Sequence, residues 1–361
     1  FGLNASVFEN IKESSVDKYE YILPELTIDQ NLFSSKNLGN LDMLTNFKVH
    51  NYETNKHSSF LVNDLNWDYK DFVFKSGLKG KILGNLRNIN YETKNEDLYK
   101  DNTTHELFGA IGYLSQLNLE KRINDTIKEL KPKFLIRYSP NKNMRKEESA
   151  STLSPLSAFT LNRNDNFNNY EIGLSASLGV DYKVAKKNKK FDFSIAQIIN
   201  EKENNKMADK SSLNEELSDL VFTSKYEINE KFKFSFDGAI DQNYNDINYS
   251  NINTELNFNP FKVDFNYLEE NKHIGDKKYF KTKLSYMRDS AEFSLETKKD
   301  LITNSSEFYN LSYEYLNDCL RAGIVYRREF YNDSELEPEN SLMFKVTLTP
   351  FGDIKSPSFD R

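Results

Sequence analysis

The sequence has too few hydrophobic residues to build the cores of a conventional soluble protein. They make up 38% of its 361 residues, whereas a soluble chain of this length would contain two or three domains, each with its own core. Disorder is also excluded. Aromatic residues make up 14% of the chain, with 27 Phe and 21 Tyr, and unfolded chains are poor in them. The chain is therefore polar overall, rich in aromatic residues and folded.

Long apolar runs, excess positive charge and paired cysteines are also lacking. No run approaches the roughly 18–20 apolar residues of a membrane-spanning helix. The net charge of -7 disfavours a nucleic-acid partner, which requires Lys and Arg to neutralise phosphates. The basic run from Lys186 to Lys190 predicts a solvated loop tip. The single Cys319 cannot form an internal disulfide, and in an oxidising compartment it indicates a partner elsewhere. The chain begins at Phe1, so we expect a mature chain or a fragment of a longer one.

Motifs for catalysis and metal binding are missing as well. Four histidines, His50, His57, His105 and His273, are scattered without the spacing of a metal site. There is no Gly-rich phosphate loop and no G-x-S-x-G segment. A catalytic constellation assembled from distant strands stays open as an alternative. With no motif in its favour, we expect neither an enzyme nor a cofactor.

The dominant pattern in the sequence is alternation of apolar and polar residues with a period of two, which predicts β-strands. About 18 candidate strands occur, many of roughly 9–11 residues, the length that crosses a bilayer at a tilt. The clearest examples are "IGLSASLGVDY" from Ile172, "FKVDFNYL" from Phe261, "FKTKLSYM" from Phe280 and "FYNLSYEYL" from Phe308.

Short and long connections alternate along the chain. Tight polar turns are predicted about 30 residues apart, at 229–230, 259–260, 289–290 and 317–318, and earlier at 37–40 and 68–71. Longer polar loops are predicted between them, near 242–250, 269–277, 298–306 and 332–340. Outer-membrane barrels have short periplasmic turns and longer extracellular loops. The fold class predicted is therefore all-β, a large antiparallel transmembrane β-barrel with meander topology, in which Trp67 suits the aromatic girdle.

One long connection, residues 139–169, lacks alternation and contains two of the eight prolines. A segment of this length is either functional or disordered. Two interpretations stay open: an extracellular loop without a special role, or a loop folded over or into the barrel lumen. At the other end of the chain, Phe344, Val346 and Leu348 alternate with polar residues. Together with Phe351 they predict the last strand.

Several stretches resemble LptD (also called OstA or Imp), the family of lipopolysaccharide-assembly outer-membrane proteins, in its α-proteobacterial form. They are "YEYILPELTI" from Tyr19, "DLNWDY" from Asp64, "LKPKFLIRYSP" with "LSAFTLNRNDNFNNYEIGLSASLGVDY", "SSLNEELSDLVF" from Ser211, and the final block from Asn317 to Gly352. The resemblance covers essentially residues 1–361, as a C-terminal barrel domain, and the final block is its most specific part.

One stretch departs from the family pattern. Arg163 matches it and is the candidate lumen-loop residue. Where relatives carry an Asp-Arg pair after the loop, this chain has Asn168 and Asn169. Any salt bridge built on that pair is therefore in doubt.

The resemblance implies transport without catalysis at the outer membrane of a Gram-negative bacterium. Lipopolysaccharide would arrive from a periplasmic bridge protein. Its acyl chains would pass through a lateral gate between the first and last strands, and its saccharide through the lumen. A lumenal lipoprotein of the LptE type is a further implied partner. Family barrels have on the order of two dozen strands, so we expect the first strands and the periplasmic domain to be missing from this chain.

The resemblance also gives roles to residues near the C-terminus. It places Cys319 where a family cysteine bonds to one in the periplasmic domain, so an interdomain disulfide is expected. The strand with Phe344, Val346, Leu348 and Phe351 becomes one side of the lateral gate and the signal that barrel-assembly machinery reads.

Other functions remain open at this stage. A porin would end in an aromatic residue on its last strand, whereas a polar tail follows here. A TonB-dependent receptor would need an N-terminal plug domain. A secreted adhesive or structural β protein is the third possibility, and solubility without detergent would favour it.

Overall fold

The fold is described from a computed structural model of the chain. The described residues are 1–10, 18–52, 54–96, 99–140, 145–146, 151–163, 170–317, 320–330, 340–348, 352–355 and 359–360, and for residues 348, 352–355 and 359–360 the description is of the backbone alone. No helix within these ranges is both long and apolar enough to cross a membrane.

The described chain forms 22 β-strands and three short 3-10 helices. The strands of the first half are β1 (Gly2–Glu9), β2 (Tyr19–Ser35), β3 (Gly39–Tyr52), β4 (His57–Asp68), β5 (Phe72–Val73), β6 (Leu78–Lys94), β7 (Thr104–Leu117), β8 (Leu119–Ile123), β9 (Thr126–Ser139), β10 (Gly173–Lys186) and β11 (Lys189–Asn200). Those of the second half are β12 (Leu220–Ile228), β13 (Phe232–Ile240), β14 (Ile247–Phe258), β15 (Phe261–Glu270), β16 (Lys278–Arg288), β17 (Ala291–Asp300), β18 (Ser306–Leu316), β19 (Leu320–Glu329), β20 (Asn340–Leu348), β21 (Gly352–Lys355) and β22 (Phe359–Asp360). The helices are η1 (Ser157–Phe159), η2 (Asp209–Ser211) and η3 (Lys272–Ile274).

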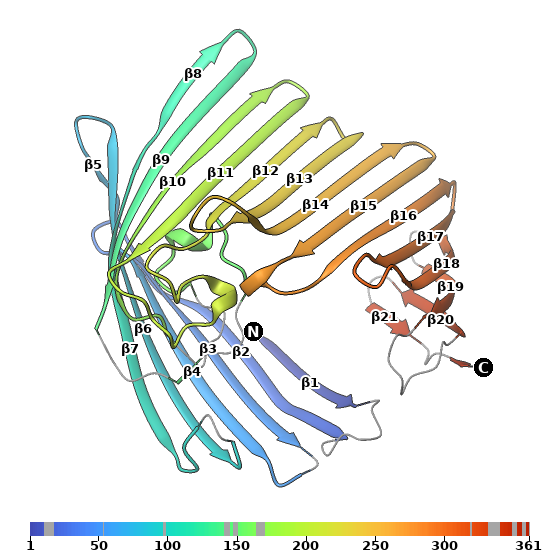
Figure 1. The fold of residues 1–361 in the computed structure, drawn as a ribbon, viewed down its shortest axis with the longest axis horizontal. Helices are drawn as coiled ribbons and strands as arrows, with labels where there is room; N and C mark the ends of the chain where they lie inside the picture. Colours follow the sequence, from blue (N-terminus) through green and yellow to red (C-terminus); the bar gives the residue numbers. More distant parts are fainter. Residues whose placement is uncertain are drawn as a thin grey trace.

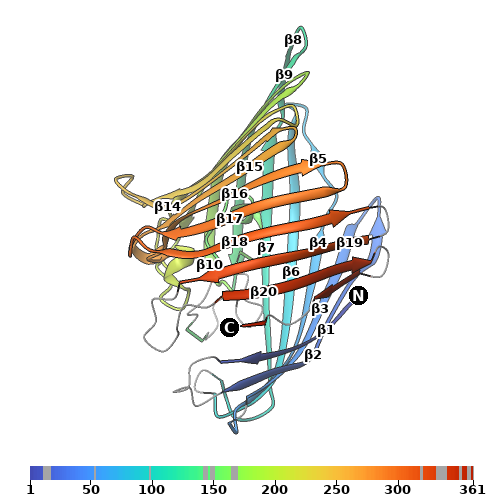
Figure 2. The same cartoon turned by 90° about the vertical axis from the view of Figure 1, so that its right-hand side faces the viewer.

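All the strands belong to one antiparallel sheet in which neighbours in the chain pair with each other. Two short strands pair only with the strand that follows them, β5 with β6 and β8 with β9, so β4 continues to β6 and β7 to β9. The sheet curls around the connection that joins β9 to β10 (Figure 1, Figure 2). Within the described residues no pairing joins β1 to β20. The meander predicted from the sequence is confirmed.

From β9 onward, the short turns lie at one edge of the sheet and the long connections at the other. The short-turn edge includes residues 187–188, 229–231, 259–260 and 289–290. Asn229 and Asp289 adopt left-handed φ values of 52° and 49° there, which Asn and Asp tolerate better than most residues. The opposite edge, called here the long-loop edge, carries residues 140–172 and 201–219. The alternation of short and long connections predicted from the sequence is confirmed between β10 and β18. Residue 318 of the predicted last turn and residues 332–339 of the predicted last loop lie outside the described residues.

The pairing of β7 with β9 is the shortest between two long neighbouring strands of the curled sheet. It joins residues 111–116 to residues 133–138, which is six pairs. By contrast, β6 pairs with β7 over 14 residues, and β9 with β10 over 14. The strands before and after this pairing run in different directions (Figure 1). We call it the narrow pairing.

The two faces of the sheet differ in chemistry. On the outward face, apolar residues lie opposite one another across five strands, in the row Leu284, Leu295, Leu311, Tyr326 and Leu342. Each of these side chains is at least 39% exposed. On the inward face, the row across the neighbouring positions is Glu255, Asp264, Lys283, Glu296, Asn310 and Arg327. A curved sheet with an apolar outside and a charged inside has the pattern of a transmembrane barrel wall.

The strand predicted to be last is followed by two further strands. The backbone of β20 pairs with β19 on one side, and with β21 and β22 on the other. An edge strand exposes unpaired N–H and C=O groups, and here backbone from the polar tail pairs with those of β20. The role of β20 as the gate and signal strand stays a prediction.

Candidate functional site

The most distinctive part of the molecule is the connection between β9 and β10, which packs against the inward face of the sheet. Its described residues 151–163 and 170–172 include η1, and we call them the inner segment. At least six of its side chains are at most 8% exposed. They include Ala158, Phe159, Leu161, Arg163, Tyr170 and Glu171. An exposed loop would not bury such residues, so the inner segment is an integral part of the interior.

Two glycines in the sheet make room for the inner segment. A Cβ atom on Gly112 of β7 would lie 2.6 Å from Leu161 Cδ2, and one on Gly179 of β10 would lie 2.9 Å from the ring of Phe159. Real Cβ contacts are essentially never this close. Any larger residue at these positions would push the inner segment away from the wall.

A buried ionic cluster holds the far end of the inner segment. Arg163 Nη1 donates to Glu171 Oε1 at 2.8 Å and to Ser175 Oγ at 3.1 Å. Its Nη2 donates to Ser177 Oγ at 3.1 Å. Arg137 on β9 donates through Nη2 to the carbonyl oxygen of Glu171 at 2.6 Å, and through Nε to a second carbonyl of the inner segment. Arg137 Nη1 also lies 3.7 Å from Glu171 Oε1, so one carboxylate is close to two guanidinium groups.

A second buried pair continues this cluster across the wall. Arg87 on β6 donates to both oxygens of Asp64 on β4 at 2.7 Å each. The two residues face each other directly in the strand register. The ring of Tyr170 lies between the guanidinium carbons of Arg87 and Arg137, at 5.7 and 5.6 Å from its centroid. The Tyr170 hydroxyl donates to Asn85 Oδ1 at 2.5 Å.

Burial shifts the pKa values of two inner-segment residues in this cluster. It lowers the pKa of Arg163 to about 10, although the carboxylate of Glu171 opposes the shift. It also raises the pKa of Tyr170 to about 12. Arg163 is therefore charged and Tyr170 neutral at any physiological pH. Removing one partner of a buried pair leaves an uncompensated charge, which costs roughly 3–5 kcal/mol.

Beyond the inner segment, the inward face of the second half of the sheet carries alternating charges. Glu255 accepts from Lys233 at 2.9 Å and from Lys262 at 3.2 Å. Lys262 also reaches Asp264 at 3.3 Å. Most of these groups are partly exposed, so each pair contributes at most about 1 kcal/mol to stability. Together these groups form a hydrated inward wall with hydrogen-bond donors and acceptors along its length.

The residues singled out from the sequence have different places in the structure. Arg163 lies in the buried cluster of the inner segment, and its role as a lumen-loop residue stays a prediction. Phe344 points outward on β20, opposite Ile324, and is 44% exposed. Val346 is on the same strand, and Leu348 ends it. Phe351, Cys319, Asn168 and Asn169 lie outside the described residues.

Sequence reasoning missed most partners of Arg163. Arg163 forms a salt bridge with Glu171, two positions beyond Asn169 in the sequence. Arg137 carried one usable signal, since it follows Leu135 at the inward spacing of β9. The contact between Tyr170 and Asn85 joins residues 85 positions apart, which no local pattern indicates.

A cluster of metal-binding side chains is lacking in the part of the chain that the structure describes. No group of three His, Cys, Asp or Glu side chains within this part is arranged to hold a metal ion. What the site provides is a fixed inner segment, a charged inward wall and an apolar outward wall. These are features of a conduit at a membrane.

Comparison with known protein families agrees with these structural features. The chain matches the family LPS transport system D, LptD, over residues 1–299. A comparison with curated proteins finds no match. The final block, which resembled the family most specifically, lies beyond the matched residues, so that part of the resemblance stays a prediction. With most of its length matched and an all-β sheet of the expected kind, the chain belongs to the LptD family, which transports lipopolysaccharide and assembles it at the outer membrane.

Proposed function

We propose that this chain, residues 1–361, is the barrel part of an LptD protein and that lipopolysaccharide passes it by two routes. The acyl chains leave sideways between β1 and the C-terminal strands, while the saccharide follows the inward face. The observation that carries the proposal is the opposite chemistry of the two faces. Saccharide hydroxyls can exchange hydrogen bonds with the charged inward wall, and acyl chains match the apolar rows outside.

The inner segment has a specific role in this proposal. It is a fixed part of the lumen that narrows the saccharide route beside β6 to β10. A loop that swings open would expose the pair between Arg163 and Glu171, whose members are 0% and 3% exposed in their side chains. We expect the inner segment to stay in place while lipopolysaccharide passes along the wall of β12 to β18.

Several partners belong to the proposal. They are a periplasmic bridge protein that delivers lipopolysaccharide, a lumenal lipoprotein of the LptE type, and the barrel-assembly machinery. The protein acts in transport and assembly, and we propose that it has no enzymatic activity. The family match leaves the porin and TonB-dependent receptor alternatives without support.

Depletion of the full-length protein in the bacterium tests the function. We expect newly made lipopolysaccharide to accumulate at the inner membrane, because its exit route is gone. Re-expression of the full-length protein should restore delivery to the cell surface. Normal surface delivery during depletion would refute the function.

Cys319 is proposed to form a disulfide with a cysteine of the periplasmic domain. The proposal rests on the resemblance and on the single cysteine of this sequence. Non-reducing electrophoresis of the full-length protein should show a mobility difference between the wild type and Cys319→Ser. Identical mobilities would exclude the bond.

A further inference from the structure

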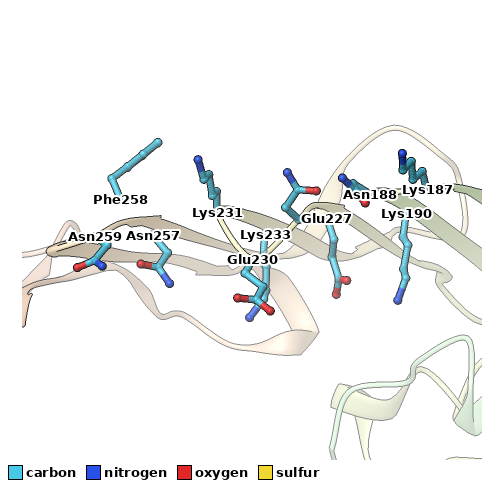
Figure 3. A pocket seen from close by; sticks show the side chains of 11 residues that line it. Lys187, Asn188, Lys190, Glu227, Glu230, Lys231, Lys233, Asn257, Phe258 and Asn259 are labelled. Carbon is cyan, nitrogen blue, oxygen red and sulfur yellow. The ribbon is translucent and has the colours of Figure 1, made fainter.

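An open groove lies at the short-turn edge of the sheet, where the turns after β10, β12 and β14 stand side by side (Figure 3). Its volume is about 860 Å³. It is lined by Lys187, Asn188, Lys190, Glu227, Asn229, Glu230, Lys231, Lys233, Asn257, Phe258 and Asn259. Lys190 and Glu227 point to one side of the turns, and Lys231 and Phe258 to the other. We call it the rim groove.

Positive charge exceeds negative charge in the rim groove. Four lysines and two glutamates line it, although the whole chain has a net charge of -7. Along the wall, Lys233, Lys262 and Lys281 each have a carboxylate within 3.3 Å. Among the described residues, no ion pair is formed by the rim lysines Lys187, Lys190 and Lys231. Lys187 and Lys231 point to one side of the turns and Lys190 to the other (Figure 3), so the excess charge is available to an anion that lies across the tips of the turns.

The rim groove continues into the interior. A second cavity of about 470 Å³ on the inward face shares Glu227 and Lys233 with it. The second cavity extends past Lys225 to Lys283 and Glu296 on β16 and β17. An anionic group held at the rim would thus lie at the start of the charged inward wall.

We propose that the rim groove receives the phosphate groups of lipopolysaccharide where it enters from the short-turn edge. This inference rests on the proposed function and adds a binding site to it. Lysine binds phosphate as a flexible point charge, and a cluster of such charges also speeds the arrival of an anionic ligand. Exposed charges bind weakly in water, which suits a site that must release its ligand onward.

A charge-neutralising variant with a matched control tests the rim groove. The test variant is Lys187→Gln with Lys190→Gln and Lys231→Gln in the full-length protein. The control is Lys36→Gln with Lys75→Gln and Lys121→Gln, which removes three exposed lysines from other hairpins at the same edge. A heat-dependent shift in gel mobility, the mark of a folded barrel, confirms that each protein is assembled.

Equilibrium binding in detergent decides whether the rim groove takes phosphate. The probes are lipopolysaccharide with its lipid A phosphates intact and the same glycolipid after enzymatic dephosphorylation. We expect the test variant to bind the phosphorylated probe about tenfold more weakly at low salt, since three exposed contacts are lost. The difference should vanish at about 1 M salt, where charges are screened within roughly 3 Å. Binding of the dephosphorylated probe should be unchanged.

Three outcomes would overturn the inference. They are equal binding of both probes by the wild type, an equal loss in the control variant, and complete competition by phosphatidylglycerol in the same detergent. The last result would assign the rim groove to ordinary anionic lipids. Insertion of lipopolysaccharide into liposomes is measured separately with the wild type. If the wild type binds the phosphorylated probe preferentially but does not insert lipopolysaccharide into liposomes, the proposed function is contradicted. The assignment of the rim groove as a phosphate site would still hold.

Discussion

At the scale of single residues, the interior depends on charged groups whose side chains are at most 5% exposed. Arg163 and Arg137 share Glu171, and Arg87 holds Asp64. The cost of removing these charges from water is offset only while every partner is present. Such clusters favour one arrangement of the chain, because any other would leave a charge buried alone.

Replacing Arg163 by Gln should destabilise the inner segment. The change leaves Glu171 without its shortest ion pair, and we expect a loss of roughly 3–5 kcal/mol. Hydrogen exchange of residues 151–163 should rise, and the urea midpoint of the folded barrel should fall. Lys183→Gln is the control, because its pair with Asp192 is exposed and contributes at most about 1 kcal/mol. Equal effects of the two changes would contradict the conclusion that the buried ion pair of Arg163 holds the inner segment in place.

A double-mutant cycle tests the fit between Gly112 and Leu161. Gly112→Ala should cost roughly 1–3 kcal/mol through overpacking, and Leu161→Ala roughly 2–5 kcal/mol through a cavity. The double variant should lose less than the sum of the two, because the smaller side chain accommodates the added Cβ. Urea unfolding in detergent measures all three variants. Simple additivity would show that the two positions do not touch.

At the scale of elements, two connections at the long-loop edge are joined by a hydrogen bond that depends on the protonation of a histidine. His273 on η3 lies 2.9 Å from Asp219, at the end of the connection 201–219. The hydrogen bond to Asp219 raises the pKa of His273 above its usual 6.5, and burial opposes this. Glu215 and Asp209 raise it further.

Stability at the long-loop edge should therefore depend on pH. Because the folded-state pKa of His273 is raised, the link contributes fully below pH 6.5 and is lost as the pH rises through the folded value. Hydrogen exchange in residues 201–219 and 271–277 should be slower at pH 6 than at pH 8.5, after correction for intrinsic rates. His273→Asn should abolish this difference. If His273→Asn keeps the full pH dependence of hydrogen exchange, that dependence comes from other titratable groups.

The elements themselves were largely predictable from the sequence. Alternation and turn residues predicted about 18 strands, and 18 of the 22 observed strands have eight residues or more. The short strands β5 and β8 were missed, since two to five residues are too few for a period to show. The strands after β20 were missed because backbone pairing at an edge demands no side-chain pattern. The buried cluster escaped prediction because its members come from strands far apart in the chain.

At the scale of the whole molecule, the two faces of the sheet decide which substitutions are tolerated. Leu311 faces outward at 56% exposure, and its neighbour Asn310 faces inward beside Glu296. Leu311→Lys should cost about 2–4 kcal/mol near the bilayer midplane, whereas Asn310→Lys should cost about 1 kcal/mol or less on the hydrated face. Folding into liposomes, followed by denaturant titration, measures both. A reversed order would mean that the faces have been assigned the wrong way round.

The narrow pairing of β7 with β9 has a mechanical consequence. Six residue pairs hold two halves of a large sheet together there, and the inner segment crosses that place, with Leu161 on Gly112 of β7 and two of its carbonyls bound by Arg137 of β9. The inner segment therefore reinforces the narrow pairing by contacting both of its strands. If the inner segment were displaced, the two half-sheets could rotate about the narrow pairing and widen the interior. The barrel diameter would then be set by a loop as well as by the number of strands.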